Sequence, residues 1–406
     1  MPETITATIV CIGRFHHFEL AKELEHRRML DHIFTGYPRW KLTGTNIHPD
    51  RIRTFPWLQT PYMGMVRWSG FIESRLGQNW AWIAQETLDR HVAEYHADSA
   101  IMFALSGSGL TCGRLAPARG SKFVCDRGSA HIQVQNEILS EEYSRWGERF
   151  PGIDQRMIEK EEAEYEIADC ITVPSGFAYR SFLSRGISKD KLHIIPYGVD
   201  LHRFKQVGMP DSNTFKVLFV GRVSFQKGFP DLLTAFGMLK HPKKYLQVVG
   251  GLSPEIARYL KRYPHDPSIE FLGHLPRIQL TSLMSNSHVL VLPSIQDGFG
   301  LVLTQALACG CPVIATVHTG AADIIKDRQE GFIVPIRDPK AIAEKMQLLA
   351  DDKNIRSAMS HKALDRIRYI GGWSDYGNKI VDLFSQIVKS KMTDDESKGR
   401  SLSDLQ

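Results

Sequence analysis

The chain has 406 residues, of which 43% are hydrophobic and 23% are charged, a composition typical of globular proteins and a length sufficient for two domains. The net charge of +5 is modest, and no tract of Lys and Arg resembles a nucleic-acid-binding arm, so we expect no nucleic-acid partner. The six cysteines form no C-x-x-C pair, the N-terminal residues lack a signal-peptide pattern, and no apolar run is long enough to span a bilayer. We therefore expect a reduced, cytoplasmic protein.

The first half of the chain alternates apolar, strand-like runs with helical patterns. A buried strand over 5–12, then Gly13, then a helix over 18–29 is how a nucleotide-type α/β domain begins. The G-x-G-x-x-G pattern is missing, so no dinucleotide site is predicted. We expect residues 1–200 to form one Rossmann-like domain. Its further strands are predicted at 32–35, 100–104, 122–126, 170–173 and 193–195, with helices over 158–168 and 176–185.

Residues 38–77 are less regular and mix aromatic with basic side chains. One interpretation is an acceptor-binding or membrane-surface face. The favoured one is a helical lid with its aromatic rings in the core and its arginines outside. The residues concerned are Trp40, Trp57, Tyr62, Trp68 and Phe71 among Arg39, Lys41, Arg51, Arg53 and Arg67.

The predicted strand 122–126 leads into a polar loop, residues 127–131. Ligands of open α/β sheets bind outside the carboxyl ends of the strands, so this loop is placed to line a cleft and to touch a substrate. We take His131 as its candidate catalytic residue, with Asp126 and Arg127 as alternatives. A buried structural histidine is an equally good interpretation of His131.

The second half repeats the α/β alternation after a polar linker, residues 201–214. Residues 215–373 are predicted to form a second α/β domain. An amphipathic helix is expected over 374–390, and the polar residues 391–406 are predicted to be disordered. The strands of the second domain are predicted at 215–220, 246–249, 269–272, 288–292, 312–315 and 331–334, and its later helices at 300–309, 340–350 and 354–369.

Two cations stand directly after the first strand of this second domain. The segment 221–228 reads Gly-Arg-Val-Ser-Phe-Gln-Lys-Gly and places Arg222 and Lys227 at the carboxyl end of the sheet. A guanidinium can bind a diphosphate through two parallel hydrogen bonds, and an ammonium acts as a point charge. Taken alone, the pair is also compatible with a solvated surface loop.

The stretch 288–316 predicts a buried strand, a loop, a short helix that ends at Gly310, and another strand. Gly298 and Gly300 would let backbone N–H groups approach a ligand, and the N-terminus of the helix favours an anion. Asp297 precedes this anion site, and Gln305 lies in the helix behind it.

Together these motifs resemble those of the family-4 glycosyltransferases. The segment 221–228 matches the Gly-Arg-x4-Lys-Gly motif of that family. The stretch 288–316 matches its Glu-x7-Glu signature except at the two acids, where Asp297 and Gln305 stand. The resemblance is strongest over 215–335. It implies the GT-B fold, in which two Rossmann-like domains face each other across a cleft and the C-terminal helix crosses back to the first domain.

The resemblance also implies roles for single residues. Arg222 and Lys227 would hold the diphosphate as it departs, and Asp297 would accept hydrogen bonds from the donor sugar. Gln305 would bind the ribose hydroxyls, more weakly than an ionised acid does. The remaining donor contacts would come from Gly298, Phe299, Gly300 and Leu301 and, near the base, from His274 and Leu275.

No Asp-x-Asp occurs and no His/Asp cluster has ligand spacing, so we expect no metal and no cofactor besides the donor substrate. The family retains the anomeric configuration, which implies front-face attack in which the departing phosphate helps to remove the acceptor's proton. We therefore expect a retaining hexosyltransferase of polysaccharide biosynthesis. It would transfer a sugar from a nucleoside-diphosphate sugar to a glycan, lipid-linked or small-molecule acceptor, with peripheral contact to the inner membrane face. The alternatives are an inactive nucleotide-sugar binder and a nucleotide-sugar epimerase.

Overall fold

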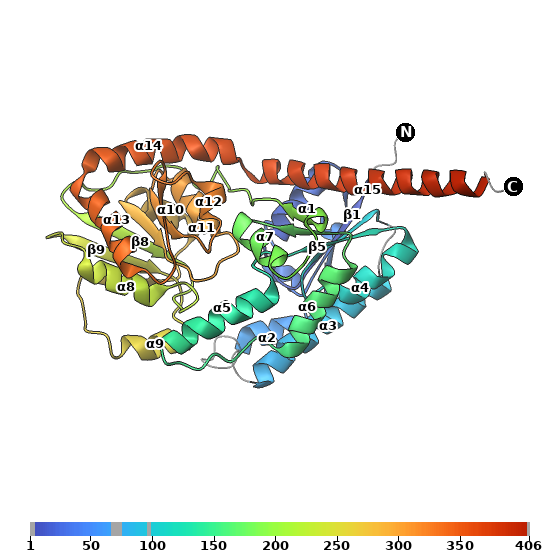
Figure 1. The fold of residues 1–406 in the computed structure, drawn as a ribbon, viewed down its shortest axis with the longest axis horizontal. Coiled ribbons are helices and arrows are strands. Elements are labelled where there is room, and N and C mark those ends of the chain that lie inside the picture. The colour runs from blue at the N-terminus through green and yellow to red at the C-terminus, as the bar shows by residue number, and fades with distance from the viewer. Residues whose placement is uncertain (1–4, 66–74, 96–98, 404–406) are drawn as a thin grey trace.

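Two α/β lobes lie side by side in the computed structural model, which describes residues 5–65, 75–95 and 99–403, with side chains described as far as Lys389. Each lobe contains one parallel sheet with helices packed on it (Figure 1). The sheets belong to the segments predicted as two Rossmann-like domains, and the predicted fold class is confirmed.

The first sheet has the strand order β3-β2-β1-β4-β5-β6-β7. Its order reverses between β1 and β4, and such a reversal opens a crevice at the carboxyl ends of the strands. The strands are β1 Ala7–Cys11, β2 Leu30–Thr35, β3 Ile52–Thr54, β4 Ile101–Leu105, β5 Lys122–Asp126, β6 Cys170–Val173 and β7 Leu192–Ile194. The helices of this domain are α1 His17–His26, α2 Gln59–Met65, α3 Arg75–Tyr95, α4 Leu110–Leu115, α5 Ile132–Arg145, α6 Gln155–Ile167 and α7 Gly176–Leu183.

The second sheet has the order β10-β9-β8-β11-β12-β13, and its reversal lies between β8 and β11. The two predicted phosphate-binding segments are the loops that follow these two strands, so the topology brings both to one crevice. The strands are β8 Phe215–Val220, β9 Lys244–Val249, β10 Ile269–Gly273, β11 Val289–Leu292, β12 Val313–Thr316 and β13 Gly331–Val334. The helices are α8 Phe229–Met238, α9 Pro254–Leu260, α10 Arg277–Ser285, α11 Leu301–Ala308, α12 Ala321–Ile324, α13 Pro339–Asp351 and α14 Lys353–Ile370.

The last helix, α15 (Trp373–Ser403), leaves the second domain and lies along the first (Figure 1). Arg27, which caps the C-terminus of α1, donates a hydrogen bond to Asn378 Oδ1 at 2.7 Å, and the ring of Phe384 packs edge-on against Phe103 of β4. The predicted crossover is therefore confirmed. The helix was expected to end at 390 before a disordered tail, whereas the structure continues it to Ser403.

The region 38–77 departs from the favoured interpretation of a lid with buried aromatic rings. It contains β3 and α2, but the side chains of Trp40 and Trp57 are 68% and 74% exposed. Arg67, Trp68 and Phe71 lie outside the described residues. Among the helices that the structure describes, none is long and apolar enough to cross a membrane.

Candidate active site

A cleft of about 580 Å³ lies between the two domains. Its walls come from the loop after β1, the loop after β5 and the loop before α11, all at carboxyl ends of strands. The lining residues are Arg14, Phe15, His16, Phe18, Glu19, Gly128 and Tyr197 from the first domain, Arg277, Asp297, Phe299, Gly300 and Leu301 from the second, and Trp373 at the start of α15.

The loop before α11 touches the first domain directly. A Cβ at Gly298 would lie 2.0 Å from the carbonyl oxygen of Gly128, so this approach requires a glycine. Ser175 Oγ donates to the carbonyl of Gly298 at 2.5 Å, and Gln296 Nε2 donates to Ser129 Oγ at 2.6 Å. The predicted polar loop 127–131 thus reaches the cleft through Gly128.

Lys227 and Asp297 meet at the N-terminus of α11. The Lys227 ammonium forms an ion pair with Asp297 Oδ2, while Asp297 Oδ1 accepts the backbone N–H of Gly300 at 3.1 Å and that of Phe299 at 3.4 Å. Gly300 caps the helix with a φ of 77°, a conformation that glycine adopts without strain. The protein's own carboxylate therefore occupies a position where a cation and a helix end favour an anion.

Arg222 lies in the same loop as Lys227, two residues after the end of β8. Its side chain is exposed and is not among the residues that line the cleft. It lies close to Tyr62 of α2 in the first domain: burial raises the pKa of Tyr62, and the charge of Arg222 opposes that rise. The structure thus places the two predicted phosphate-binding cations on one loop, with Lys227 at the N-terminus of α11 and Arg222 exposed, close enough to Tyr62 to affect its pKa.

The residues predicted near the nucleoside lie behind and beside the helix end. Gln305 is half-buried on α11, and no hydrogen bond of its side chain to another described residue is found. His274 is exposed and Leu275 is half-buried in the loop after β10. The ring of His274 lies so close to Gly251 that a Cβ there would be 3.0 Å from its Nε2, so the loops after β9 and β10 meet at this point.

His131 does not line the cleft. The structure supports the interpretation of His131 as a buried structural histidine rather than as a catalytic residue. It is buried at the N-terminus of α5, where its Nδ1 accepts the backbone N–H of Gln133 at 3.3 Å. Its ring packs against Tyr165 and Phe182. Burial, together with the charge of Arg127, lowers the pKa of His131 to about 4. Its side chain therefore stays neutral and holds a helix end.

The variant His131→Asn is expected to keep transfer activity per folded molecule, because asparagine preserves the cap. Its stability should be lower, since the ring leaves a cavity, and should depend less on pH. In the native protein a lowered histidine pKa contributes stability above pH 6.5 that is lost as the pH falls through 4, because the unfolded chain binds the proton more readily. Urea unfolding at pH 7.5 and pH 5 measures the difference; a large loss of activity in folded protein would restore the catalytic role.

His16 is a cleft residue that the sequence motifs did not single out. It follows Gly13 at the carboxyl end of β1, and its Nε2 lies 2.8 Å from Oδ2 of Asp126 at the end of β5. The two residues are 110 positions apart in the sequence. The only available signal was their position, each after a strand next to the reversal of the sheet. The sequence alone suggests Asp126 only as an alternative to His131.

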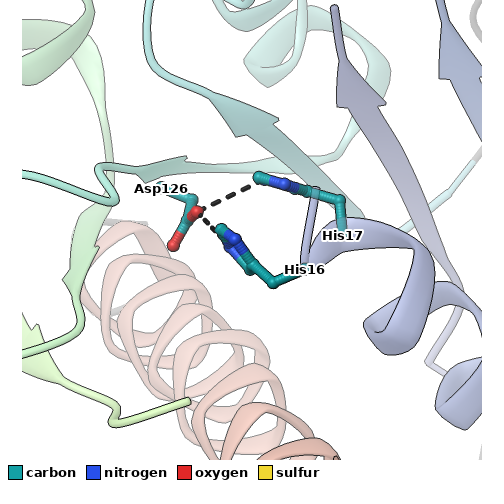
Figure 2. Close-up of side chains that lie close together, drawn as sticks. All are labelled: His16, His17 and Asp126. Carbon is teal, nitrogen blue, oxygen red and sulfur yellow. Dashed lines mark hydrogen bonds and ion pairs between the residues drawn. The ribbon is translucent and has the colours of Figure 1, made fainter. Parts of the chain in front are cut away.

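In the part of the chain that the structure describes, one group of side chains is close enough to offer three metal ligands, namely His16, His17 and Asp126 (Figure 2). The 2.8 Å between His16 Nε2 and Asp126 Oδ2 is a direct hydrogen-bond distance. It is shorter than the roughly 3.3 Å between neighbouring ligands of a tetrahedral zinc ion. The two imidazole rings also contact each other, with centroids 4.1 Å apart and an interplanar angle of 36°. We therefore interpret the group as hydrogen-bonded histidines.

Comparison with known proteins agrees with this geometry. Residues 202–366 match the family model "Glycosyl transferases group 1". D-inositol 3-phosphate glycosyltransferase of Xylanimonas cellulosilytica is 32% identical over 231 residues, which are 51% of this chain and 54% of that protein. The capsular polysaccharide biosynthesis glycosyltransferase CapM of Staphylococcus aureus is 32% identical over 161 residues, 38% of this chain and 42% of the relative. The chain thus spans about half the length of these curated relatives.

Solved structures extend the likeness to both domains. Sucrose-phosphate synthase from Thermosynechococcus elongatus superposes with a TM-score of 0.74 at 21% identity, over 95% of this chain and 100% of that chain. Anabaena Alr3699/HepE, solved in complex with UDP and glucose, has a TM-score of 0.70 at 16% identity, over 94% of this chain and 100% of its own. Residues 202–366 therefore belong to the group 1 glycosyltransferases, and the two-domain chain that carries them has the GT-B fold.

Proposed function

We propose that the protein transfers a sugar from a nucleoside-diphosphate sugar to a hydroxyl group of an acceptor, with retention of the anomeric configuration and without a metal ion. The observation that carries this proposal is that Asp297 and the N-terminus of α11 line the interdomain cleft and that Lys227 forms an ion pair with Asp297 there. Such a site suits a diphosphate, because a cation and oriented N–H groups stabilise negative charge there.

The ion pair between Lys227 and Asp297 indicates how the donor would bind. The donor diphosphate would take over the Lys227 ammonium and the N–H groups of Phe299 and Gly300, which Asp297 now satisfies. The freed carboxylate of Asp297 would then accept hydrogen bonds from hydroxyls of the donor sugar. Charge that develops on the leaving diphosphate would thus be stabilised by groups already in place.

Arg222 would bind the same diphosphate from its exposed position at the end of β8. Two cations and a helix end supply the positive charge that a divalent metal provides in many phosphate sites, which supports a metal-independent reaction. Retention of configuration rests on the resemblance of the loops after β8 and β11 to the family-4 motifs.

For the substrates, the relatives support a class of donor and a class of acceptor rather than single compounds. HepE was solved with UDP and glucose, so UDP-sugars are the first donors to test. CapM is named for capsular polysaccharide biosynthesis, which supports a glycan acceptor. The exposed Trp40, between Arg39 and Lys41 in the sequence, and the exposed Trp57 would suit contact with the acceptor or with a membrane surface.

A thermal-shift screen with UDP-, GDP-, ADP- and dTDP-sugars tests this function, followed by acceptor trials with the best donor. We expect one donor to raise the melting temperature, slow release of its nucleoside diphosphate, and faster release with acceptor. Arg222→Ala should abolish the shift, whereas Arg368→Ala, an exposed arginine on α14, should not. The proposal would be contradicted if the protein bound a donor without releasing nucleoside diphosphate, or if it converted the donor sugar into its epimer. An unchanged donor-induced rise in melting temperature in Arg222→Ala would also contradict it.

Gln305→Glu is expected to tighten nucleotide binding by up to about tenfold, because an ionised acceptor makes a stronger hydrogen bond to a ribose hydroxyl than an amide does. The substitution keeps the size of the side chain, and the half-buried Gln305 has no described hydrogen-bond partner that the carboxylate would have to displace. Isothermal titration calorimetry with the nucleoside diphosphate measures the change. Equal affinity in both forms would remove the ribose role of Gln305.

A further inference from the structure

A second pocket, of about 390 Å³, lies in the second domain at the opposite end of the sheet from the cleft. It is lined by Ser287 and His288, which precede β11, and by Pro312, which precedes β12. The cleft lies at the carboxyl ends of these strands, so the four residues of β11, about 13 Å in length, separate the two sites. The volume of the pocket is in the range of small-molecule binding sites.

Helix α14, which lies along the outside of the second domain (Figure 1), forms one wall of this pocket. The side chains that it contributes are spaced three and four residues apart and therefore share one face of the helix. They are Lys353, Arg356, Ser357, Ser360 and His361. The linker between the domains forms the facing wall through Gln206, Met209, Pro210 and Ser212.

The pocket carries positive charge without a carboxylate in its wall. None of the described residues that line it is acidic, whereas Lys353 and Arg356 are cations. Asp352 caps the N-terminus of α14, and its Oδ1 accepts the backbone N–H groups of Asn354 at 2.8 Å and Ile355 at 3.0 Å. It forms no ion pair with either cation, so the pocket favours an anionic ligand.

The guanidinium of Arg356 has donors left for such a ligand. The residue is half-buried and donates from Nη1 to the carbonyl of Leu349 at 2.6 Å, one of the five N–H groups of an arginine. Burial lowers the pKa of Arg356, and the charge of Asp352 offsets this effect only in part. A partly buried cation without an ion-pair partner is stabilised by an anion that takes up its free N–H groups.

His288 adds a buried donor to the same pocket. Its side chain is fully buried, and its Nδ1 accepts the backbone N–H of Lys216 at 2.9 Å, so the proton of the neutral ring is on Nε2. Nε2 has no hydrogen-bond partner in the described part of the chain, although the carbonyl of Asp211 in the linker is near enough to act on the ring. This N–H is thus directed towards the linker wall and is left without an acceptor, which costs free energy.

The exposure of these side chains orders them by depth. His288 is buried and forms the floor, Arg356 is half-buried, and Lys353 and Ser357 are exposed at the rim. An anion here would meet donors from below, from one side and from above. A tetrahedral phosphate has oxygens in all these directions, whereas a planar carboxylate has not.

We propose that this pocket binds a phosphate group, as inorganic phosphate or as the phosphomonoester of a small metabolite, between α14 and the linker. The inference goes beyond the proposed function and does not depend on it. Met209, Pro210 and Pro312 would contact the organic part of an ester. Because the linker joins the two domains, a bound phosphate would also hold residues 206–212 against α14.

Isothermal titration calorimetry of the full chain with inorganic phosphate and with glucose 6-phosphate tests the site, at constant ionic strength. Ser357→Glu places a negative charge at the exposed rim, and we expect it to weaken binding about tenfold or more. Ser357→Gln, of the same size without the charge, is the matched control and should bind nearly as well as the native protein. Tighter binding of the ester than of inorganic phosphate would identify an ester as the occupant, and equal binding would identify phosphate itself.

Two further measurements separate this pocket from the candidate active site. Lys227→Ala, in the cleft, should bind both probes unchanged, whereas Arg356→Gln should weaken them. Hydrogen exchange of the backbone over 206–214 should slow when phosphate is added to the native protein and to Ser357→Gln, but not to Ser357→Glu. The inference fails if neither probe binds at millimolar concentration, if Ser357→Glu and Ser357→Gln bind equally, or if Lys227→Ala abolishes binding.

Discussion

Lys227→Ala is expected to lower kcat/KM for sugar transfer by about 10²- to 10³-fold, because it removes a fixed charge from the site where the leaving diphosphate becomes more negative. Water cannot replace the ammonium at equal strength, since the side chain of Lys227 is only 21% exposed and its charge is partly shielded from solvent. Initial rates at subsaturating donor, with the donor that gives the largest thermal shift, measure the change.

The structure also predicts how the effect divides between binding and transfer. Lys227 now pairs with Asp297, whose other oxygen accepts the N–H of Gly300. The diphosphate must displace this carboxylate from both partners, so Asp297 competes with the donor's charge. Lys227→Ala should therefore weaken binding of the nucleoside diphosphate as well as transfer.

Asp297→Asn provides the matched contrast at the same contact. We expect it to bind the nucleoside diphosphate at least as tightly as the native protein, because a negative charge beside the phosphate is removed. Its transfer rate should still fall, because an amide is a weaker acceptor for the hydroxyls of the donor sugar. Lys362→Ala on the exposed face of α14 is the neutral control. Equal losses of binding in Lys227→Ala and Asp297→Asn would contradict the assignment.

The second domain could be predicted closely because its signals are local. The strands β8 and β13 have the predicted bounds, since each is a short apolar run bordered by turn residues. Gly310 follows the C-cap residue of α11, as predicted, with a φ of 71° that glycine adopts freely. The loops that follow β8 and β11 meet because the strand order of the sheet reverses between these two strands. The sequence motifs predict this meeting of the loops only through the family resemblance.

The first-domain site was harder to predict because its contacts are remote in the sequence. His16 and Asp126 become partners only through the pairing of β1 with β4 and of β4 with β5. His131 lies five residues after Asp126, the last residue of β5, and was therefore predicted as the catalytic residue. In the structure it is buried as the N-cap of α5. No local pattern separates a histidine that faces the cleft from one that faces the interior.

The helix α5 was not predicted at all, and its sequence explains why. Its hydrophobic residues form no clear stripe, because its C-terminal end packs on the second domain as well as the first. Figure 1 shows α5 extending from the first domain towards α9. Tyr143 donates a hydrogen bond to Glu255 of α9, and the ring of Trp146 stacks on Phe225. Such a helix is specified by contacts between domains, which a single sequence does not reveal.

Asp231→Ala is expected to lower the free energy of unfolding by about 3 kcal/mol, because it leaves the guanidinium of Arg145 without its main partner. Asp231 lies in the first turn of α8 in the second domain, and its side chain is 2% exposed. Arg145, at the end of α5, binds it through two hydrogen bonds of 2.8 and 2.7 Å. Urea-induced unfolding followed by tryptophan fluorescence measures the loss.

The expected cost is large because this contact belongs to a network. Glu142 of α5, whose side chain is fully buried, accepts hydrogen bonds from Arg145, from the indole of Trp146 and from Arg337 of the second domain. Two carboxylates and two arginines thus neutralise each other across the domain boundary. Removing one carboxylate leaves excess positive charge in a place where water screens it poorly.

The exposed pair Arg258–Glu148 provides the matched control, because it joins the same two domains at the rim of the interface. Arg258 is 54% exposed, so Glu148→Ala should cost less than about 1 kcal/mol. Asp231→Ala should also increase the radius of gyration measured by X-ray scattering without nucleotide, since the buried network would no longer hold the domains together. Equal costs for the two variants, or an unchanged radius, would show that α5 packs on the second domain through its aromatic rings alone and that the charges do not hold the cleft closed.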